Sequence, residues 1–111
     1  MANPMFQIYI GKDGQCHFRF ITSDDEIVLI SEGYASVEDC VEIINGIKAN
    51  CGDSRMYKKT IEANEKYGFV LLTNKGEMIG KSRAYETGHD RDNGISSVMH
   101  KAPDASVEDR S

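Results

Sequence analysis

Ser31-Glu32-Gly33-Tyr34-Ala35-Ser36 is the stretch that decides the fold, because it leads from a strand pattern into a helix pattern and recurs later in the chain. Its counterpart, 51 positions later, is Ser82-Arg83-Ala84-Tyr85-Glu86-Thr87. Identical residues at the same spacing include Ile10 and Ile61, Phe18 and Phe69, Thr22 and Thr73, Glu26 and Glu77, Asp39 and Asp90, and Ile44 and Ile95. We therefore predict an internal duplication, with repeats over residues 6–56 and 57–107.

The length of 111 residues favours one compact domain. Each repeat alone is near the size at which a single hydrophobic core becomes marginal, so the two repeats are expected to share one core. The apolar fraction of 40% and the charged fraction of 28% are typical of a globular chain. Only the ends, residues 1–5 and 108–111, are expected to be loose.

Each repeat shows three strand patterns followed by a helix pattern. In the first repeat the strands are expected over residues 6–10, 16–22 and 26–31. Asp13-Gly14 and Ser23-Asp24-Asp25 supply the turns between them. Three antiparallel strands in a meander follow from this order.

Ser36 is the expected N-cap of the first helix, with Asp39 at capping-box spacing. An apolar stripe at three- and four-residue spacing follows it: Val37, Cys40, Val41, Ile44 and Ile47. The second repeat has the same plan, with strands expected over 57–61, 67–73 and 77–82 and a helix capped by Thr87. Glycines at positions 88 and 94 weaken that helix, and a short edge strand is expected near Val107.

Charge and hydropathy limit the classes of function. The formal net charge of −5 argues against binding to phosphate backbones. A basic group in the second half leaves a local nucleic-acid surface as an alternative: Arg55, Lys58, Lys59, Lys66, Lys75, Lys81, Arg83 and Arg91. The apolar runs are too short to cross a bilayer, and residues 1–5 lack the pattern of a secretion signal. We expect a cytoplasmic protein without a membrane partner.

The motif around the two tyrosines resembles the YegP-like proteins, a family of small, mostly bacterial chains with one or two copies of a domain of unknown function. The resemblance covers nearly the whole chain. It rests on Ser31-Glu32-Gly33-Tyr34, on the Ser or Thr two residues later, and on Gly94-Ile95-Ser96-Ser97-Val98. The chain departs from the family pattern at Ile43-Ile44-Asn45-Gly46-Ile47 and at Arg83, where the family usually has an acid.

The resemblance implies that each copy ends in a further strand and that the copies join in one sheet with these final strands exchanged. The segment from Met56 to Ile61 then belongs partly to the first copy, and the segment around Val107 plays the same part for the second. We therefore predict an α+β fold in which two β-β-β-α-β repeats share one antiparallel sheet, with two helices packed on it. The family brings no established activity, cofactor or catalytic residue.

Five residues are the candidates for an interaction surface or for determining the fold: Tyr34, Tyr85, Ser31, Ser82 and Arg83. Two related tyrosines just ahead of two helices can flank a ligand or peptide groove between the copies. The alternative is structural, with each ring buried at the sheet edge and its hydroxyl holding the turn. The duplication favours the structural alternative, because residues that determine the fold must recur in each copy.

The sequence offers no catalytic or metal-binding constellation. The three cysteines lack Cys-x-x-Cys spacing, and the three histidines lack a ligand spacing. No phosphate-binding glycine loop or nucleophile elbow is present. We therefore expect no enzyme activity, no metal and no cofactor.

The function that fits these observations is a non-enzymatic module that binds a protein or peptide. A nucleic-acid-associated protein is the second hypothesis, which the exposed group of Tyr9, His17 and Arg19 on one strand face also permits. A small-molecule-binding protein or enzyme with a site between the repeats is the third. Because the tandem supplies both copies in one chain, we expect a monomer.

Overall fold

The computed structural model describes residues 3–22 and 25–111. Residues 23 and 24 of the predicted Ser23-Asp24-Asp25 turn lie outside the described residues. The strands are β1 Met5–Ile10, β2 Cys16–Ile21, β3 Ile27–Ser31, β4 Tyr57–Ile61, β5 Tyr67–Leu72, β6 Met78–Ser82 and β7 Ser106–Asp109. The helices are α1 Val37–Asn50 and α2 Gly88–Lys101, with short 3₁₀ turns at Ser54–Met56, Ala63–Glu65 and Ala102–Asp104.

The described strands form one sheet in the order β4-β5-β6-β3-β2-β1-β7. The first meander (β1, β2, β3) and the second (β4, β5, β6) meet where β3 pairs with β6, and Ser31 lies opposite Gly80 there. Both repeats carry a β-bulge at the same relative place, after Phe20 and after Leu71. The α+β fold with two repeats in one sheet is therefore confirmed.

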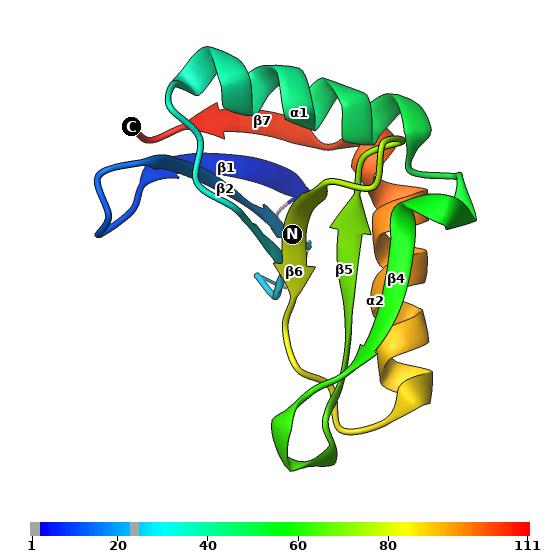
Figure 1. Ribbon diagram of the computed structural model, residues 1–111. Coiled ribbons are helices and arrows are strands. Elements are labelled where there is room, and N and C mark those ends of the chain that lie inside the picture. The colour runs from blue at the N-terminus through cyan, green and yellow to red at the C-terminus, as the bar shows by residue number, and fades with distance from the viewer. Residues whose placement is uncertain (1–2, 23–24) are drawn as a thin grey trace.

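The sequence had suggested a sheet that is antiparallel throughout, and this prediction is wrong for one pair of strands. β7 pairs with β1 in parallel, with Val107 opposite Phe6, while the other pairings are antiparallel. The parallel direction follows from topology, because α2 and the turn after it return the chain to the far edge of the first meander (Figure 1). The last strand of the second repeat thus completes the first repeat's half of the sheet, and β4 pairs with β5 of the second repeat.

Strand pairing also extends into the ends that were expected to be loose. Met5 is the first residue of β1, and Glu108 and Asp109 belong to β7. Arg110 continues the contact, because its backbone N–H donates to Ile8 O over 2.8 Å. The partner strand β1 supplies these hydrogen bonds, which a composition argument cannot detect.

Both helices pack on the sheet, as Figure 1 shows, with α1 along β1 and β7 and α2 behind β4 and β5. The buried core runs through both repeats and includes Phe6, Ile8, Phe18, Phe20, Leu29, Cys40, Ile44, Ile47, Phe69, Leu71 and Val98. The helices begin at the predicted caps, where Ser36 Oγ accepts from the Asp39 N–H and Thr87 Oγ1 accepts from the Asp90 N–H. Neither helix of the described chain has the length and apolar composition needed to cross a membrane.

Two helical glycines provide a test of this packing. An added Cβ at Gly46 in α1 has no atom within 4 Å, whereas one at Gly94 in α2 would lie 2.3 Å from the Tyr85 hydroxyl. We expect Gly46→Ala to raise the free energy of unfolding by about 0.5–1 kcal/mol through helix propensity. Gly94→Ala is expected to lower the free energy of unfolding, because the steric clash with Tyr85 outweighs the gain in helix propensity. Urea unfolding of both variants would reveal the opposite signs, and equal stabilisation by both would contradict the packing.

Candidate functional site

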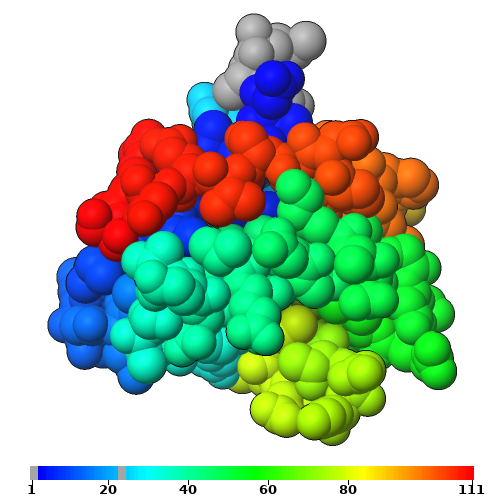
Figure 2. Space-filling view, turned by 90° about the horizontal axis from the view of Figure 1, so that it is seen from above, coloured from blue at the N-terminus to red at the C-terminus, as the bar shows by residue number. Residues whose placement is uncertain are grey.

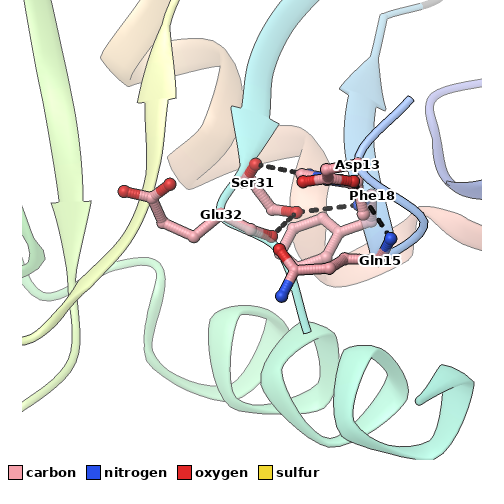
Figure 3. Close-up of polar contacts among 6 residues, drawn as sticks. Asp13, Gln15, Phe18, Ser31 and Glu32 are labelled. Carbon is pink, nitrogen blue, oxygen red and sulfur yellow. Dashed lines mark hydrogen bonds and ion pairs between the residues drawn. The ribbon is translucent and has the colours of Figure 1, made fainter. Parts of the chain in front are cut away.

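Ser31 and Ser82 occupy equivalent places at the ends of β3 and β6. Ser31 Oγ accepts from the Phe18 N–H over 2.8 Å and donates to Glu32 O (Figure 3). Ser82 Oγ accepts from the Phe69 N–H over 2.9 Å and donates to Arg83 O. Each hydroxyl therefore joins two backbone groups beside the strand end. This geometry gives both serines a role in holding the chain as it leaves the sheet.

A polar cluster next to Ser31 occurs in the first repeat alone. The His17 ring places Nδ1 3.2 Å from Ser31 O and Nε2 3.0 Å from the Asp13 carboxylate. Both ring nitrogens thus face acceptors, which favours the doubly protonated imidazolium. Asn64 and Gly68 stand at the equivalent positions of the second repeat and cannot form this pair.

This pair predicts a pH dependence of stability. Burial lowers the pKa of His17, but hydrogen bonds to Ser31 O and the Asp13 carboxylate outweigh it and raise the pKa above 6.5. The Gln15 N–H and then the His17 side chain lower the pKa of Asp13 below 3.8. Because the pKa of His17 is raised, its protonated form stabilises the fold at pH below 6.5, and this stabilisation is lost as the pH rises through the pKa of the folded state. Because the pKa of Asp13 is lowered, its ionised form stabilises the fold at pH above 3.8.

We therefore expect Asp13→Asn to lower the urea midpoint most at about pH 5–6 and least above about pH 8, where His17 is neutral. Measuring both proteins across this range isolates the pair from the other histidines, which the two proteins share. A difference in midpoint that does not vary with pH would contradict the ion pair.

Tyr34 and Tyr85 occupy equivalent places but differ in their hydroxyl partners. Each pairs as an isolated bridge with the start of a strand, Tyr34 with Cys16 and Tyr85 with Tyr67. The Tyr34 hydroxyl donates to Ile79 O over 3.4 Å. Within the described chain, the Tyr85 hydroxyl is buried and has no hydrogen-bond partner. Burial raises the pKa of both, that of Tyr85 to about 12.

Each tyrosine lies near one of two related clefts between the repeats. The α1 cleft is about 480 Å³ and lies between α1 and the β5–β6 turn of the other repeat. The α2 cleft is about 390 Å³ and lies between α2 and the β2–β3 segment of the other repeat. Six lining positions correspond at the 51-residue spacing: 22 and 73, 28 and 79, 42 and 93, 43 and 94, 46 and 97, and 50 and 101.

The α1 cleft combines apolar and polar lining. Its lining residues are Glu42, Ile43, Gly46, Asn50, Asp53, Arg55, Met56, Leu72, Thr73, Asn74, Gly76 and Ile79. Figure 2 shows the yellow-green residues of the β5–β6 turn beside α1. The four apolar side chains come from α1, the turn before β4, and the β5–β6 hairpin. Both repeats therefore build the cleft, and half a chain could not.

The charged residues that line the α1 cleft are Glu42, Asp53 and Arg55, and two further carboxylates lie near Tyr34. Glu42 forms no ion pair among the described residues, and neither do Glu32 and Glu77. The negative charges of Glu32 and Glu77 both contribute to raising the Tyr34 pKa, after burial and Cys40. In Figure 3 the Glu32 carboxylate points away from the Asp13 cluster and toward β6. Because Asp53 and Arg55 pair with each other, Glu42 is the charge in the lining of the α1 cleft that is unpaired within the described chain.

The equivalent positions near the α2 cleft carry an ion pair instead. Arg83 replaces Glu32 in the repeat register, and its guanidinium pairs with Glu26, the counterpart of Glu77. The same guanidinium lies 5.3 Å from the centroid of the Tyr85 ring. Arg83 is the residue that departs from the family pattern. It therefore places a cation beside Glu26, whereas the first repeat has a second acid, Glu32, at the equivalent position.

Most of the basic residues in the second half are paired within the fold. Of the eight residues in the basic group named from the sequence, six form ion pairs: Arg55 with Asp53, Lys59 and Arg91 with Asp92, Lys66 with Glu86, Lys81 with Glu62, and Arg83 with Glu26. On the open sheet face, Tyr9 stacks on His17 at 5.7 Å and lies under Arg19 at 4.7 Å. Lys58 and Lys75 remain outside these pairs, so most of this basic group is already neutralised within the fold and is less available to a phosphate backbone.

The described residues bring together no groups for metal or covalent chemistry. No three His, Cys, Asp or Glu side chains among them gather as a metal ion requires. Cys16, Cys40 and Cys51 are buried and free, and burial raises the pKa of the Cys40 thiol to about 11. A thiol with a raised pKa is a poor nucleophile at neutral pH.

Comparison with known proteins points to one family. The family model described as "Domain of unknown function (DUF1508)" matches residues 12–58 and 62–109, one match for each repeat. The UPF0339 protein YegP of Yersinia pestis is 34% identical over 110 residues, which cover 98% of this chain and 97% of the relative. A UPF0339 protein in the ptx operon 5' region of Stutzerimonas stutzeri is 33% identical over 102 residues, 92% of each chain.

Two solved structures have the same fold. The solution structure of yegP from E. coli, a protein of unknown function, matches with a TM-score of 0.89 at 27% identity, covering 99% of this chain and 95% of its own. The UPF0339 protein SO3888 from Shewanella oneidensis matches with a TM-score of 0.88 at 26% identity, covering 97% and 92%. The predicted resemblance to the YegP-like proteins is confirmed.

Proposed function

The chain belongs to the DUF1508 family, and from that premise we propose that it is a non-enzymatic module that binds a short segment of a partner protein in the α1 cleft. The partner is a protein of the bacterial cytoplasm, and the chain acts as a monomer. The α1 cleft carries this proposal, because it offers apolar anchors and hydrogen-bonding groups from both repeats.

The size and lining of the α1 cleft suit a peptide side chain with its flanking backbone. Its volume of about 480 Å³ falls within the range of about 300–1,000 Å³ for small-ligand sites. Ile43, Met56, Leu72 and Ile79 offer a surface for an apolar side chain. Asn50 and Asn74 offer amide groups that can bond to a peptide backbone, as occurs in mixed interfaces.

An unpaired carboxylate in the cleft, Glu42, and two near Tyr34, Glu32 and Glu77, favour a basic partner segment. Glu32, Glu42 and Glu77 have no cation of their own within the described chain, whereas Glu26 is paired with Arg83 at the equivalent place. The second repeat therefore provides an internal example of a guanidinium in this setting. We propose that the partner segment carries one apolar residue and at least one arginine or lysine.

Selection of a random peptide display library on the immobilised protein tests this proposal. Enriched peptides are expected to share an apolar residue near a basic one. Their affinity, measured by fluorescence anisotropy, should fall at least about tenfold for Gly46→Leu, which places a side chain in the cleft. Because no atom lies within 4 Å of an added Cβ at Gly46, the fold should remain intact.

Ser97→Leu is the matched control, because position 97 is the counterpart of position 46 and lines the α2 cleft. Peptide affinity should not change in that variant. A library without enriched peptides, or equal binding to the Gly46→Leu variant, would contradict the proposal. Adding nuclease during capture from a bacterial lysate separates the nucleic-acid alternative, which predicts that captured material is lost.

A further inference from the structure

The α2 cleft is a second, chemically different cavity that the peptide proposal does not use. A stripe of α2 forms one wall, at spacings of three and four residues: Asp90, Asn93, Gly94, Ser97 and Lys101. Thr22, Glu26 and Val28 of the first repeat form the opposite wall, and residues 83–86 complete the lining. Most side chains that line the α2 cleft are polar, whereas the lining of the α1 cleft also includes two isoleucines, a leucine and a methionine.

The Tyr85 hydroxyl gives this cavity an unsatisfied group. Tyr85 is 7% exposed, its oxygen is buried, and no described residue accepts or donates a hydrogen bond to it. At the equivalent place, Tyr34 reaches the carbonyl of Ile79. Gly94 replaces Ile43 in the register and leaves room for the Tyr85 hydroxyl against α2. A buried hydroxyl without a partner is costly, so native proteins seldom retain one without a purpose.

Internal ion pairs engage two of the three carboxylates that line the α2 cleft. Glu26 is paired with Arg83, and Glu86 is paired with Lys66. Asp90 lies at the start of α2, where the helix dipole stabilises its charge. The ammonium of Lys101 forms no ion pair among the described residues, and the Asn93 amide and Ser97 hydroxyl form no side-chain hydrogen bond there.

The protonation state of Tyr85 supports the same direction of bonding. Burial is the largest cause that raises its pKa, to about 12; the charges of Glu26 and Asp90 also raise it and that of Arg83 lowers it, so the phenol is neutral and can donate its proton at physiological pH. Together with the Ser97 hydroxyl and the Lys101 ammonium, it can meet an oxygen anion. Such charge-assisted hydrogen bonds are the strong ones in buried sites.

We propose that the α2 cleft binds a small molecule with a carboxylate or phosphate group, which accepts hydrogen bonds from Tyr85, Ser97 and Lys101. Asn93 provides a further polar contact on the same wall. The volume of about 390 Å³ falls within the range of about 300–1,000 Å³ for small-ligand sites and suits a small metabolite. Because Tyr85 is covered in the structure, binding requires a small movement of the neighbouring side chains.

Titrations followed by ¹H–¹⁵N correlation spectra test this site with three probes: succinate, inorganic phosphate and neutral succinamide. At least one anion is expected to shift the amide signals of Tyr85, Gly94 and Ser97 in a saturable manner, and succinamide is not. The two anionic arms distinguish a carboxylate from a phosphate ligand. Tyr85→Phe and Lys101→Gln should each weaken the binding by about tenfold or more.

Tyr85→Phe removes only the hydroxyl oxygen, which has no hydrogen-bond partner within the described chain. The variant should therefore fold normally. Tyr34→Phe is its counterpart in the first repeat and should leave anion binding unchanged. Three outcomes would overturn the proposal: no saturable shift with either anion, equal shifts in the Tyr85→Phe variant, or shifts at surface lysines alone. Each of these is independent of peptide binding in the α1 cleft.

Discussion

Gly80→Val is expected to lower the free energy of unfolding by about 3 kcal/mol or more, because a side chain there meets the backbone of the neighbouring strand. An added Cβ at Gly80 would lie 2.7 Å from Ile30 O and 3.0 Å from Ser31 Cα. These atoms belong to β3, which joins the two repeats by pairing with β6. β3 and β6 would have to move apart, because these contacts are with backbone atoms, which cannot turn away as a flexible side chain can.

Urea unfolding measured by circular dichroism gives the size of this effect. Gly46→Val is the control, because nothing lies within 4 Å of an added Cβ at that position. It should change the free energy of unfolding by no more than about 0.5 kcal/mol. If Gly80→Val were as stable as the control, β3 and β6 could not approach each other as described.

Phe18→Ala is expected to cost about 3–5 kcal/mol, as truncation of a fully buried phenylalanine does. Phe18 is 0% exposed, packs edge-on against Phe6 at 5.9 Å and stacks with Tyr34 at 6.3 Å. The loss leaves a cavity between β2 and the start of α1. Ile61→Ala is the control, because Ile61 is 68% exposed and should matter by less than about 0.5 kcal/mol.

The same variant also tests whether the repeats share one core. Because the sheet and the buried cluster run through both repeats, Phe18→Ala should shift the unfolding of the second repeat by the same amount. Amide signals followed residue by residue in urea provide the measurement. A second repeat that retains its wild-type midpoint would show that the two halves unfold independently.

The repeat plan could be predicted because it depends on local chemistry. The caps at Ser36 and Thr87 and the glycine turn at Gly14, which has a positive φ of 79°, are short-range features that sequence spacing shows directly. The spacing between Tyr34 and Tyr85 gave the register in which these features recur. Each of these elements forms at the predicted place.

Long-range pairing could not be predicted in the same way. The parallel contact of β7 with β1 depends on where α2 ends and on an open edge of the first meander. No residue in Ser106–Asp109 signals its partner, so the terminal residues were expected to be loose. The family resemblance suggested an exchanged strand near Val107, but the prediction of one antiparallel sheet was wrong for this strand, which pairs in parallel.

The two clefts could not be predicted from the sequence either, although six of their lining positions correspond at the 51-residue spacing. Gly46 and Ser97 are equivalent positions, but their role follows only when each helix is known to face the hairpin of the other repeat. The sequence drew attention to Tyr85 because it repeats Tyr34, and to Arg83 because it departs from the family pattern. The two tyrosine hydroxyls have different surroundings, because Tyr34 reaches Ile79 O whereas Tyr85 lies against Gly94, and sequence spacing does not describe this packing.

Chemical-shift mapping of a selected peptide tests the central claim most directly. ¹H–¹⁵N spectra of the protein would be recorded with and without a peptide from the display selection. We predict that the largest shifts fall on Ile43, Gly46 and Asn50 of α1 and on Thr73 and Ile79 of the facing hairpin. Shifts confined to the open sheet face around Tyr9, or to the α2 cleft, would contradict the assignment of the α1 cleft as the binding site.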